Sequence, residues 1–194
     1  MYDIAADIGG TTTDIGLARD GEILEETVKV HETSTPLDDS RLENIFHRYE
    51  RAIGDKSIDN VGISCTGFVD YEEGELVGGI SHDPMSLDWV ENEFGSLHIS
   101  NDVDAALIGQ EFDLNRYKNA VNIVVGTGIG GAVKYGGEIL WSDQKGGHEI
   151  GFIEVDKNEW DHYCGGGSLD ERFGSSEDVY AGISGDLSEV REMN

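Results

Sequence analysis

The residues best suited to chemistry lie in the first turn of the chain, Asp7–Thr12, which reads D-I-G-G-T-T. Apolar residues alternate from Ile4 to Ile8, and this alternation predicts a strand that ends at the turn. Because glycine permits close backbone approach, the phosphates of a ligand can lie against the amides of residues 9–12. Threonine hydroxyls add donors, and Asp7 can hold a divalent ion that bridges phosphate oxygens. A tight hairpin turn is the competing interpretation, since paired glycines favour such turns.

A similar turn, G-T-G-I-G-G, recurs at Gly126–Gly131. It lies between two apolar runs, 121–125 and 132–135, which we expect to be strands. Two phosphate-type turns in two halves of one chain indicate a nucleotide held between two lobes. The repeat therefore favours the phosphate interpretation of the first turn.

The pair Asn101-Asp102 follows a predicted strand, 97–100, and precedes a predicted helix, 103–112. A carboxylate at such a boundary is held rigidly, and we expect the helix N-terminus to keep it ionised. A general base of this kind contributes about 10²–10⁴ in rate. The alternative is a simple helix cap, because Asn and Asp are both favoured at that position.

Strands and helices alternate between these motifs. We expect three short strands within residues 2–31. A helix that opens at Thr35-Pro36 and ends at Gly54 follows, and then a buried strand at 61–65. Residues 70–96 are rich in glycine and acidic residues, which favours mostly loop with one short strand near its start.

The chain divides into two predicted lobes. The first covers residues 1–118, and the second, over 119–194, is incomplete because it holds less sheet and helix than a full lobe needs. Within the second lobe we expect a turn at Gly165–Gly167 and a short helix that starts at residues 176–180.

The charge balance excludes some classes of partner. The 194 residues include 13 basic and 40 acidic side chains, a net charge of −27. Phosphate backbones and anionic headgroups are bound by Lys and Arg, so we expect neither nucleic acid nor a membrane as partner. The acidic residues are scattered along the chain, which is typical of proteins that work in concentrated salt. An ordinary acidic cytosolic protein is the alternative.

The sequence predicts a cytoplasmic protein. It has no run of about 18 apolar residues, and its N-terminus lacks the basic and apolar regions of a secretion signal. The two cysteines, Cys65 and Cys164, are far apart and lack metal-ligand spacing. This use of cysteine suits a reducing compartment.

Three motifs in a fixed order give the chain a resemblance to a known family. D-I-G-G-T at residues 7–11, N-D-x-x-A-A at 101–106 and G-T-G-I-G-G at 126–131 follow one another as in the ROK sugar kinases and their relatives. G-H-E-I-G at 147–151 and W-D-H-Y at 160–163 resemble two later segments of that family, the first of which contacts sugar. The resemblance implies an α/β, ribonuclease-H-like (actin-like ATPase) fold, complete in the first lobe and partial in the second.

The resemblance also implies an activity, which is ATP-dependent phosphoryl transfer to a hexose or related sugar, with Mg²⁺ accompanying ATP. Asp102 would be the general base that takes the proton from the attacking sugar hydroxyl, and Asp7 would hold the Mg²⁺. The sugar would be bound by Asn101, Glu149 and Asp161. The two phosphate loops would be formed by Asp7, Gly9, Gly10, Thr11 and Thr12, and by Gly126, Thr127, Gly128 and Gly130.

The sequence departs from the family pattern in two ways. Phe152 stands where the family has a histidine, and Glu159 where it has the last cysteine of a cluster, so we expect no zinc site. Family chains also continue well past this length, with a segment that binds adenosine. We therefore expect a reduced kinase, one half of a split kinase, or an inactive sugar- or nucleotide-binding remnant. Besides a sugar, its partner would be a second copy or a complementing C-terminal chain.

Overall fold

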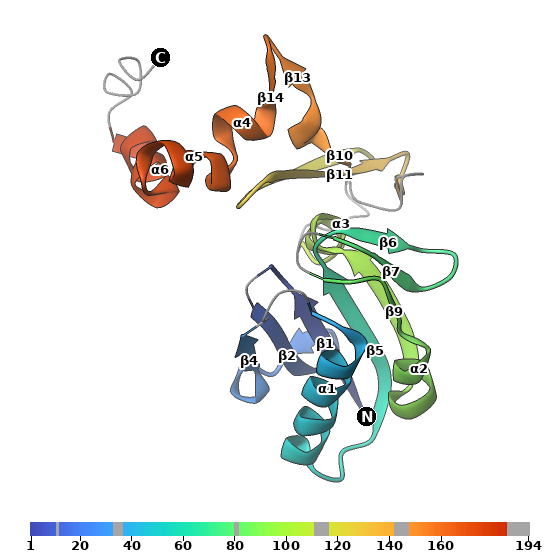
Figure 1. Ribbon diagram of the computed structural model, residues 1–194. Helices are drawn as coiled ribbons and strands as arrows, with labels where there is room; N and C mark the ends of the chain where they lie inside the picture. Colours follow the sequence, from blue (N-terminus) through green and yellow to red (C-terminus); the bar gives the residue numbers. More distant parts are fainter. Residues whose placement is uncertain (11, 33–36, 80–81, 111–116, 142–147, 186–194) are drawn as a thin grey trace. The chain divides into compact units, whose positions relative to one another are not determined.

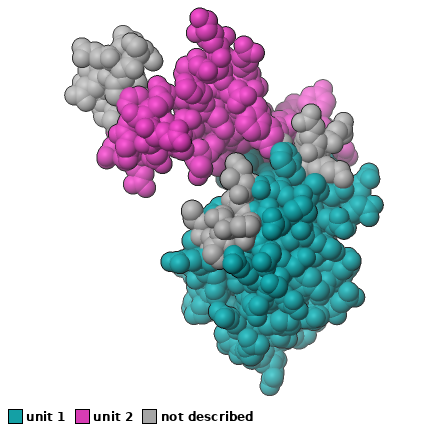
Figure 2. Space-filling view, in the orientation of Figure 1, with its two compact units in different colours: residues 1–111, 141–147 teal, residues 112–140, 148–194 magenta. Residues whose placement is uncertain are grey.

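The chain forms two compact units in the computed structural model, which describes residues 1–10, 12–32, 37–79, 82–110, 117–141 and 148–185. The first unit holds the described residues of 1–111 and 141–147, and the second holds those of 112–140 and 148–194 (Figure 2). The lobe boundary predicted after residue 118 lies a few residues beyond the first change of unit. Trp141 belongs to the first unit although it lies within the predicted second lobe.

A six-stranded sheet organises the first unit (Figure 1). Its strands run in the order β3-β2-β1-β5-β9, and β4 also pairs with β2. β1 is antiparallel to β2 but parallel to β5, which is parallel to β9. A one-turn 3-10 helix, η1 (Glu25–Thr27), precedes β4. The strands are β1 (Tyr2–Ile8), β2 (Thr12–Arg19), β3 (Glu22–Ile23), β4 (Lys29–Glu32), β5 (Ile58–Cys65) and β9 (Ser96–Asn101).

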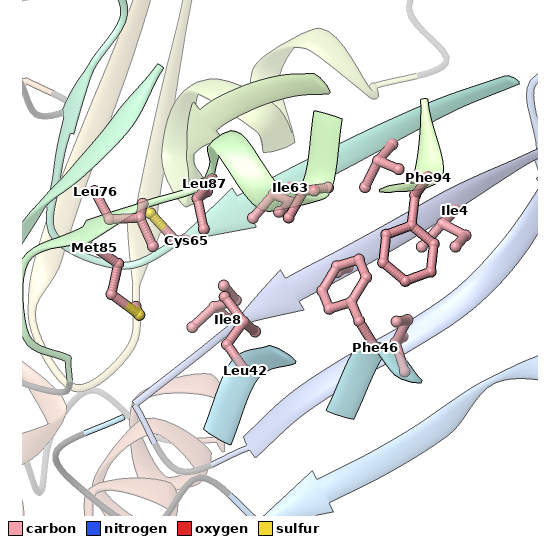
Figure 3. Packing of buried hydrophobic residues seen from close by; sticks show 14 of the residues in the cluster. Ile4, Ile8, Leu42, Phe46, Ile63, Cys65, Leu76, Met85, Leu87 and Phe94 are labelled. Carbon is pink, nitrogen blue, oxygen red and sulfur yellow. The ribbon is translucent and has the colours of Figure 1, made fainter. Parts of the chain in front are cut away.

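Helix α1 (Asp39–Ile53) covers one face of this sheet (Figure 3). Its buried residues Leu42, Phe46 and Tyr49 recur at the spacing of a helical face, as the sequence predicts. They share one hydrophobic cluster with Ile4 and Ile8, which alternate along β1 toward the same face. The core of the first unit therefore lies between α1 and the sheet.

The ends of α1 follow from its caps. The helix begins at Asp39 rather than at Thr35-Pro36, two residues that lie outside the described part of the chain. The side chain of Asp38 accepts a hydrogen bond from the amide of Arg41, so this carboxylate sets the start. Gly54 ends the helix with φ of 70°, as predicted, because glycine tolerates this conformation.

Residues 70–96 contain more regular structure than the sequence predicts. The expected short strand is present as β7 (Glu75–Gly78), which pairs with β6 (Phe68–Asp70) and β8 (Met85–Ser86). The prediction of loop is wrong for helix α2 (Asp88–Phe94). This helix buries only Val90 and Phe94, so its seven residues hold too little periodicity to be recognised.

The second unit begins with an antiparallel sheet of β10 (Ala120–Val125), β11 (Ile129–Tyr135) and β12 (Glu138–Ile139). Helix α5 (Gly166–Phe173) begins inside the predicted turn at residues 165–167, which corrects that prediction. The short helix expected from residue 176 is α6 (Ser176–Gly185). The remaining elements are η2 (Ile150–Phe152), β13 (Glu154–Val155), β14 (Asn158–Glu159) and α4 (Trp160–Cys164). Over the described residues, the helices are too short or too polar to cross a membrane.

Candidate functional site

Two loops and a helix leave the sheet of the first unit where its parallel strands end. Ile8, Cys65 and Asn101 are neighbours in the register of β1, β5 and β9. The amide of Thr66 donates to the carbonyl of Ile8 at 3.0 Å, which joins the first two loops. Ligands of open α/β sheets bind at this carboxyl edge. The first glycine turn and the Asn101-Asp102 pair therefore lie at the edge where a ligand is expected.

The first glycine turn joins β1 to β2 as a hairpin, so the competing interpretation from the sequence is structurally correct. The amide of Gly9 donates to the carbonyl of Thr12 at 2.9 Å and closes the turn. A Cβ on Gly9 would lie 3.1 Å from that carbonyl, which favours glycine here. Because the Gly9 amide already donates within the turn, a phosphate would have to be bound by other donors, such as those of Gly10 and Thr12. Thr11 lies outside the described residues.

A row of polar side chains crosses the sheet beside this turn. Asp7 pairs in register with Asp14 on one side and with Ser64 on the other, and Ser64 pairs with Ser100. Residues in register on neighbouring strands point to the same face. All four line a hollow of about 1160 Å³ in the first unit. Asp14 was not singled out in the sequence, because only the register of β1 and β2 places it beside Asp7.

Asp7 and Asp14 fit a magnesium ion. Oδ1 of Asp14 is buried and has no hydrogen-bond partner among the described residues, which costs free energy unless a cation or water meets it. Mg²⁺ is usually held by one or two carboxylates together with water and substrate phosphates. Two carboxylates side by side at the glycine turn provide this donor set.

Asn101 is the cap of helix α3 (Asp102–Ile108). Its Oδ1 accepts from the amide of Val103 and its Nδ2 donates to the carbonyl of Gly67, both at 3.0 Å. The residue is only 4% exposed, and its side-chain amide joins the start of α3 to the loop after β5. The alternative that Asp102 is the cap is therefore wrong. The helix also ends at Ile108, before the expected residue 112, which lies outside the described residues.

Asp102 is the first residue of α3 and is partly buried. Burial raises the pKa of its carboxyl group, and the negative charges of Asp7 and Asp104 raise it further, although the amide of Val103 donates to Oδ1 at 2.8 Å. This shift is opposite to the lowering of the pKa that a helix N-terminus favours, because desolvation and like charges outweigh the helix. A raised pKa makes the carboxylate a stronger proton acceptor.

A buried hydrogen-bond network supports the start of α3. The hydroxyl of Tyr71 donates to Oδ2 of Asp104 at 2.8 Å and accepts from the amide of Asn101 at 3.3 Å. Burial raises the pKa of Tyr71 and the hydrogen bond to Asp104 raises it further, so the hydroxyl keeps its proton. The ring of Tyr71 packs against Trp141, with centroids 4.6 Å apart. The network holds the backbone next to Asp102 in place, and neither Tyr71 nor Asp104 was identified from the sequence.

Replacing Tyr71 by phenylalanine should destabilise the first unit by about 1.5–3 kcal/mol, the usual contribution of a hydrogen bond to a charged group. The change removes the donor to Asp104, which is 0% exposed, and keeps the ring. Urea unfolding followed by circular dichroism measures the loss. Tyr2→Phe is the matched control, since no hydrogen bond of the Tyr2 hydroxyl is found in the described part of the sheet. Equal losses in the two variants would contradict the network.

The second glycine turn lies in the second unit. The amide of Gly126 donates to the carbonyl of Gly128 at 2.9 Å, which closes this turn much as Gly9 closes the first. The carbonyls of Gly126 and Thr127 accept from the amides of Gly166 and Gly167 at 2.7 and 2.8 Å. A Cβ on Gly166 would lie 2.5 Å from the Gly126 carbonyl oxygen, so only glycine fits at this position. The start of α5 thus holds the turn.

Asp161 and Glu149 lie near the same turn. Oδ1 of Asp161 accepts from the amide of Ile129 at 2.7 Å, so this carboxylate supports the turn from α4. Glu149 follows His148, whose backbone pairs with Gly131 of β11, one residue beyond Gly130. The predicted site residues of the second half therefore gather in the second unit. Their contacts with a sugar stay a prediction.

The residues of the absent zinc motif lie on the surface of the second unit. Phe152 is exposed, and Cys164 of α4 is an exposed free thiol. Trp160 of the same helix is also exposed. The expectation of no zinc here stays a prediction.

Comparisons with known proteins identify relatives of the chain. A sequence model described as the ROK family matches residues 3–175. A glucokinase of Thermotoga maritima is 29% identical over 171 residues, which are 80% of this chain and 51% of that protein. An N-acetyl-D-glucosamine kinase of Vibrio cholerae is 25% identical over 168 residues, 80% of this chain and 54% of that protein. The chain thus spans about half the length of these curated relatives.

Solved structures share the fold. A putative N-acetylmannosamine kinase from Listeria monocytogenes has a TM-score of 0.80 at 22% identity, covering 98% of this chain and 73% of that one. A glucokinase from Streptomyces griseus, in complex with glucose and AMPPNP, has a TM-score of 0.69 at 22% identity and covers 88% and 59%. At this identity the likeness establishes the fold alone.

Proposed function

Because this chain belongs to the ROK family, we propose that it takes part in ATP-dependent phosphoryl transfer to a hexose or related sugar. Family membership also confirms the α/β, ribonuclease-H-like (actin-like ATPase) fold that the sequence analysis expects. The observation that carries the proposal is the meeting of Asp7, the first glycine turn and Asp102 at one edge of the sheet. The curated relatives named above act on glucose and on N-acetyl-D-glucosamine, which supports a sugar as acceptor.

In the proposed reaction Asp102 takes the proton from the attacking sugar hydroxyl. The hydroxyl oxygen then bonds to the γ-phosphorus of ATP, and the bond to the bridging β–γ oxygen breaks, so ADP leaves with the electron pair. The raised pKa of Asp102 supports this role, because a stronger base accepts the proton more readily. Asn101 positions Asp102 by capping α3, and the family resemblance is the basis for proposing Glu149 and Asp161 as sugar contacts.

In this proposal, which follows the family resemblance, each glycine turn serves as a phosphate loop. Gly10, Thr11 and Thr12 serve the first turn, and Thr127, Gly128 and Gly130 serve the second. Asp7 and Asp14 would hold the Mg²⁺, which would neutralise the charge of the phosphate oxygens. Asp14 is added to Asp7 because its buried Oδ1 has no hydrogen-bond partner in the part of the chain that the structure describes.

The proposal is tested by measuring ADP formation from ATP with a panel of sugars. Glucose, N-acetyl-D-glucosamine, N-acetylmannosamine and a β-glucoside represent the substrates that the relatives' names give. We expect ADP formation that depends on one of these sugars and on Mg²⁺. Sugar-independent ADP formation, or none with any sugar at low or high salt, would contradict it.

A second candidate function is that of one part of a two-chain kinase. Val121, Ile123, Val124 and Val125 of β10 are 39–66% exposed. Successive residues of a strand point to opposite faces, so both faces of β10 are open within the described residues. A strand apolar on both faces is typical of the middle of a covered sheet. A complementing chain, or a second copy, would cover it.

The two candidates differ in what the chain does alone. The two-chain candidate predicts sugar-dependent ADP formation only after the chain is mixed with a polypeptide encoded next to it. Activity of the chain by itself would rule this candidate out. Stabilisation by sugar or AMPPNP without turnover in either preparation would favour the inactive binding remnant instead.

The proposal places the protein in the cytoplasm at high ionic strength. The acidic side chains that give the net charge of −27 repel one another. Molar salt weakens this repulsion, because it shortens the Debye screening length to about 3 Å. We therefore expect the thermal unfolding midpoint to rise steadily as KCl is raised to molar concentrations. A midpoint that is flat or falls with KCl would favour an ordinary acidic cytosolic protein.

A further inference from the structure

A histidine and two glutamates meet on the helices that cover the sheet, away from the candidate site. Nε2 of His47 lies 3.6 Å from Oε1 of Glu43 and 3.5 Å from Oε2 of Glu93. One ligand atom of each residue lies within 4.8 Å of the other two. Glu43 and His47 are one turn apart on α1, where residues four apart share a face, and Glu93 comes from α2.

We propose that Glu43, His47 and Glu93 form a binding site for a zinc-class divalent ion that ties α1 to α2. Zinc binds imidazole nitrogen and carboxylate oxygen at about 2.0–2.2 Å, so tetrahedral ligand atoms stand about 3.4 Å apart. The two measured separations from Nε2, 3.6 and 3.5 Å, are close to this value. Three protein ligands leave the fourth position for water.

The charges around His47 favour a divalent ion over the histidine alone. A third carboxylate, Glu50, has its Oε2 3.6 Å from Nδ1 of the ring. In the described part of the chain, the ion pairs of these three glutamates are all with His47. An imidazolium would set one positive charge against three negative ones. A divalent ion on Nε2 offsets more charge, and it leaves Nδ1–H to face Glu50, the partner that metal-bound histidines usually have.

Lys56 lies near the cluster but makes no ion pair with it in the described part of the chain. Lys56 lines a hollow of about 270 Å³ together with Glu50 and Glu93. Its ammonium group donates to the carbonyl of Ile53 at 2.8 Å, the last residue of α1. Among the described residues, the ion pairs of these glutamates therefore involve neither lysine nor arginine.

The packing beneath the cluster holds the two helices at a set spacing. Phe46, the neighbour of His47, packs edge-on against Phe94, the neighbour of Glu93, with ring centroids 5.6 Å apart (Figure 3). The ring of His47 lies 5.9 Å from that of Phe94. Because the core fixes the backbones, binding needs only small rotations of side chains. The ion would stabilise α2, whose N-cap residue makes no side-chain hydrogen bond.

Zinc titration of the full chain tests the proposal. All proteins carry Cys164→Ser, so that the exposed thiol binds no zinc, and are stripped of metal with a chelator before calorimetric titration with ZnCl₂. We expect a zinc site in this background that is lost in His47→Gln. Glu93→Gln should weaken binding at least about tenfold, since even outer-shell partners contribute 10–100-fold. His98→Gln is the matched control, because His98 is an exposed histidine of the same unit outside the cluster.

Thermal unfolding separates a metal site from an ion-paired histidine. Zinc should raise the unfolding midpoint of the Cys164→Ser protein and of His98→Gln, but not that of His47→Gln or Glu93→Gln. Equal zinc binding by His47→Gln and the parent protein would overturn the proposal. Absence of zinc binding by the Cys164→Ser protein would also overturn the proposal. His47 would then be a histidine that is paired with glutamates and binds no metal. Glu93 is exposed, so Glu93→Gln keeps the test valid if His47→Gln fails to fold.

Discussion

Replacing Asp102 by asparagine should lower the turnover of ATP-dependent sugar phosphorylation by about 10²–10⁴-fold, the usual contribution of a general base. The amide has the shape of the carboxylate but cannot accept the proton of the sugar hydroxyl. The KM values for ATP and sugar should change much less, because the glycine turns and the other sugar contacts are untouched. Steady-state kinetics with the best sugar of the panel measures both quantities.

The same variant should be more stable than the wild type at neutral pH. Burial and the charges of Asp7 and Asp104 raise the pKa of Asp102 in the folded protein above its unfolded value. The group therefore favours folding at pH values below its unfolded pKa, and this contribution is lost as pH rises through the folded pKa. At neutral pH the ionised carboxylate lowers the free energy of unfolding, so the protein is less stable. The neutral amide has no such effect.

Thermal unfolding as a function of pH checks this second effect. The midpoint of Asp102→Asn should exceed that of the wild type at pH 7, and the difference should vanish in acid, where Asp102 is protonated. Asp20→Asn is the control, since Asp20 is exposed in a turn with φ of 55° that asparagine also adopts. An active Asp102→Asn protein would contradict the mechanism, and a less stable one would contradict the pKa argument.

Replacing Phe46 by alanine should destabilise the first unit by about 3–5 kcal/mol, the range for truncating a buried phenylalanine. Phe46 is 0% exposed and joins α1 to α2 through Trp89 and Phe94, with ring centroids 5.4 and 5.6 Å away. The loss comprises the buried apolar surface and the cavity that remains. It would be a large part of the stability of an ordinary domain, about 5–15 kcal/mol.

Urea unfolding followed by circular dichroism measures this loss. Phe68→Ala is the matched control, because Phe68 lies in the same unit but is 39% exposed. We expect it to cost less than a third as much as Phe46→Ala. Similar costs for the two variants would mean that the aromatic cluster is not the centre of the core.

The helices show where pattern alone suffices and where it does not. The face of α1 could be predicted because Leu42, Phe46 and Tyr49 repeat over 15 residues. The sequence analysis placed the start of α1 too early, because several polar residues precede the helix. Asp38 is identified as the cap only by the hydrogen bond that it accepts from the Arg41 amide. At Gly166 the sequence predicts a turn, yet a helix forms. Glycine is needed there for close approach to the Gly126 carbonyl, and this contact outweighs its low helix propensity.

The candidate site divides in the same way. Asp7, the glycine turns and Asn101-Asp102 could be singled out from local spacing, since strand, turn and cap signals lie within a few residues of each chemical group. Asp14 could not, because its partner Asp7 is found only through the register of β1 and β2. Tyr71 is likewise distant in sequence from Asn101 and Asp104, the residues that it bonds.

Short segments of the sequence establish the family, the order of the motifs and the residue types on which the proposed phosphoryl transfer depends. The folded arrangement of the strands and helices was needed to see that Asn101 caps α3, that Asp14 lies beside Asp7, and that the pKa of Asp102 is raised. The reason is that desolvation and charge interactions depend on distances between elements. The parallel pairing of β1, β5 and β9 sets those distances by bringing Asp7 and Asp102 to one edge of the sheet.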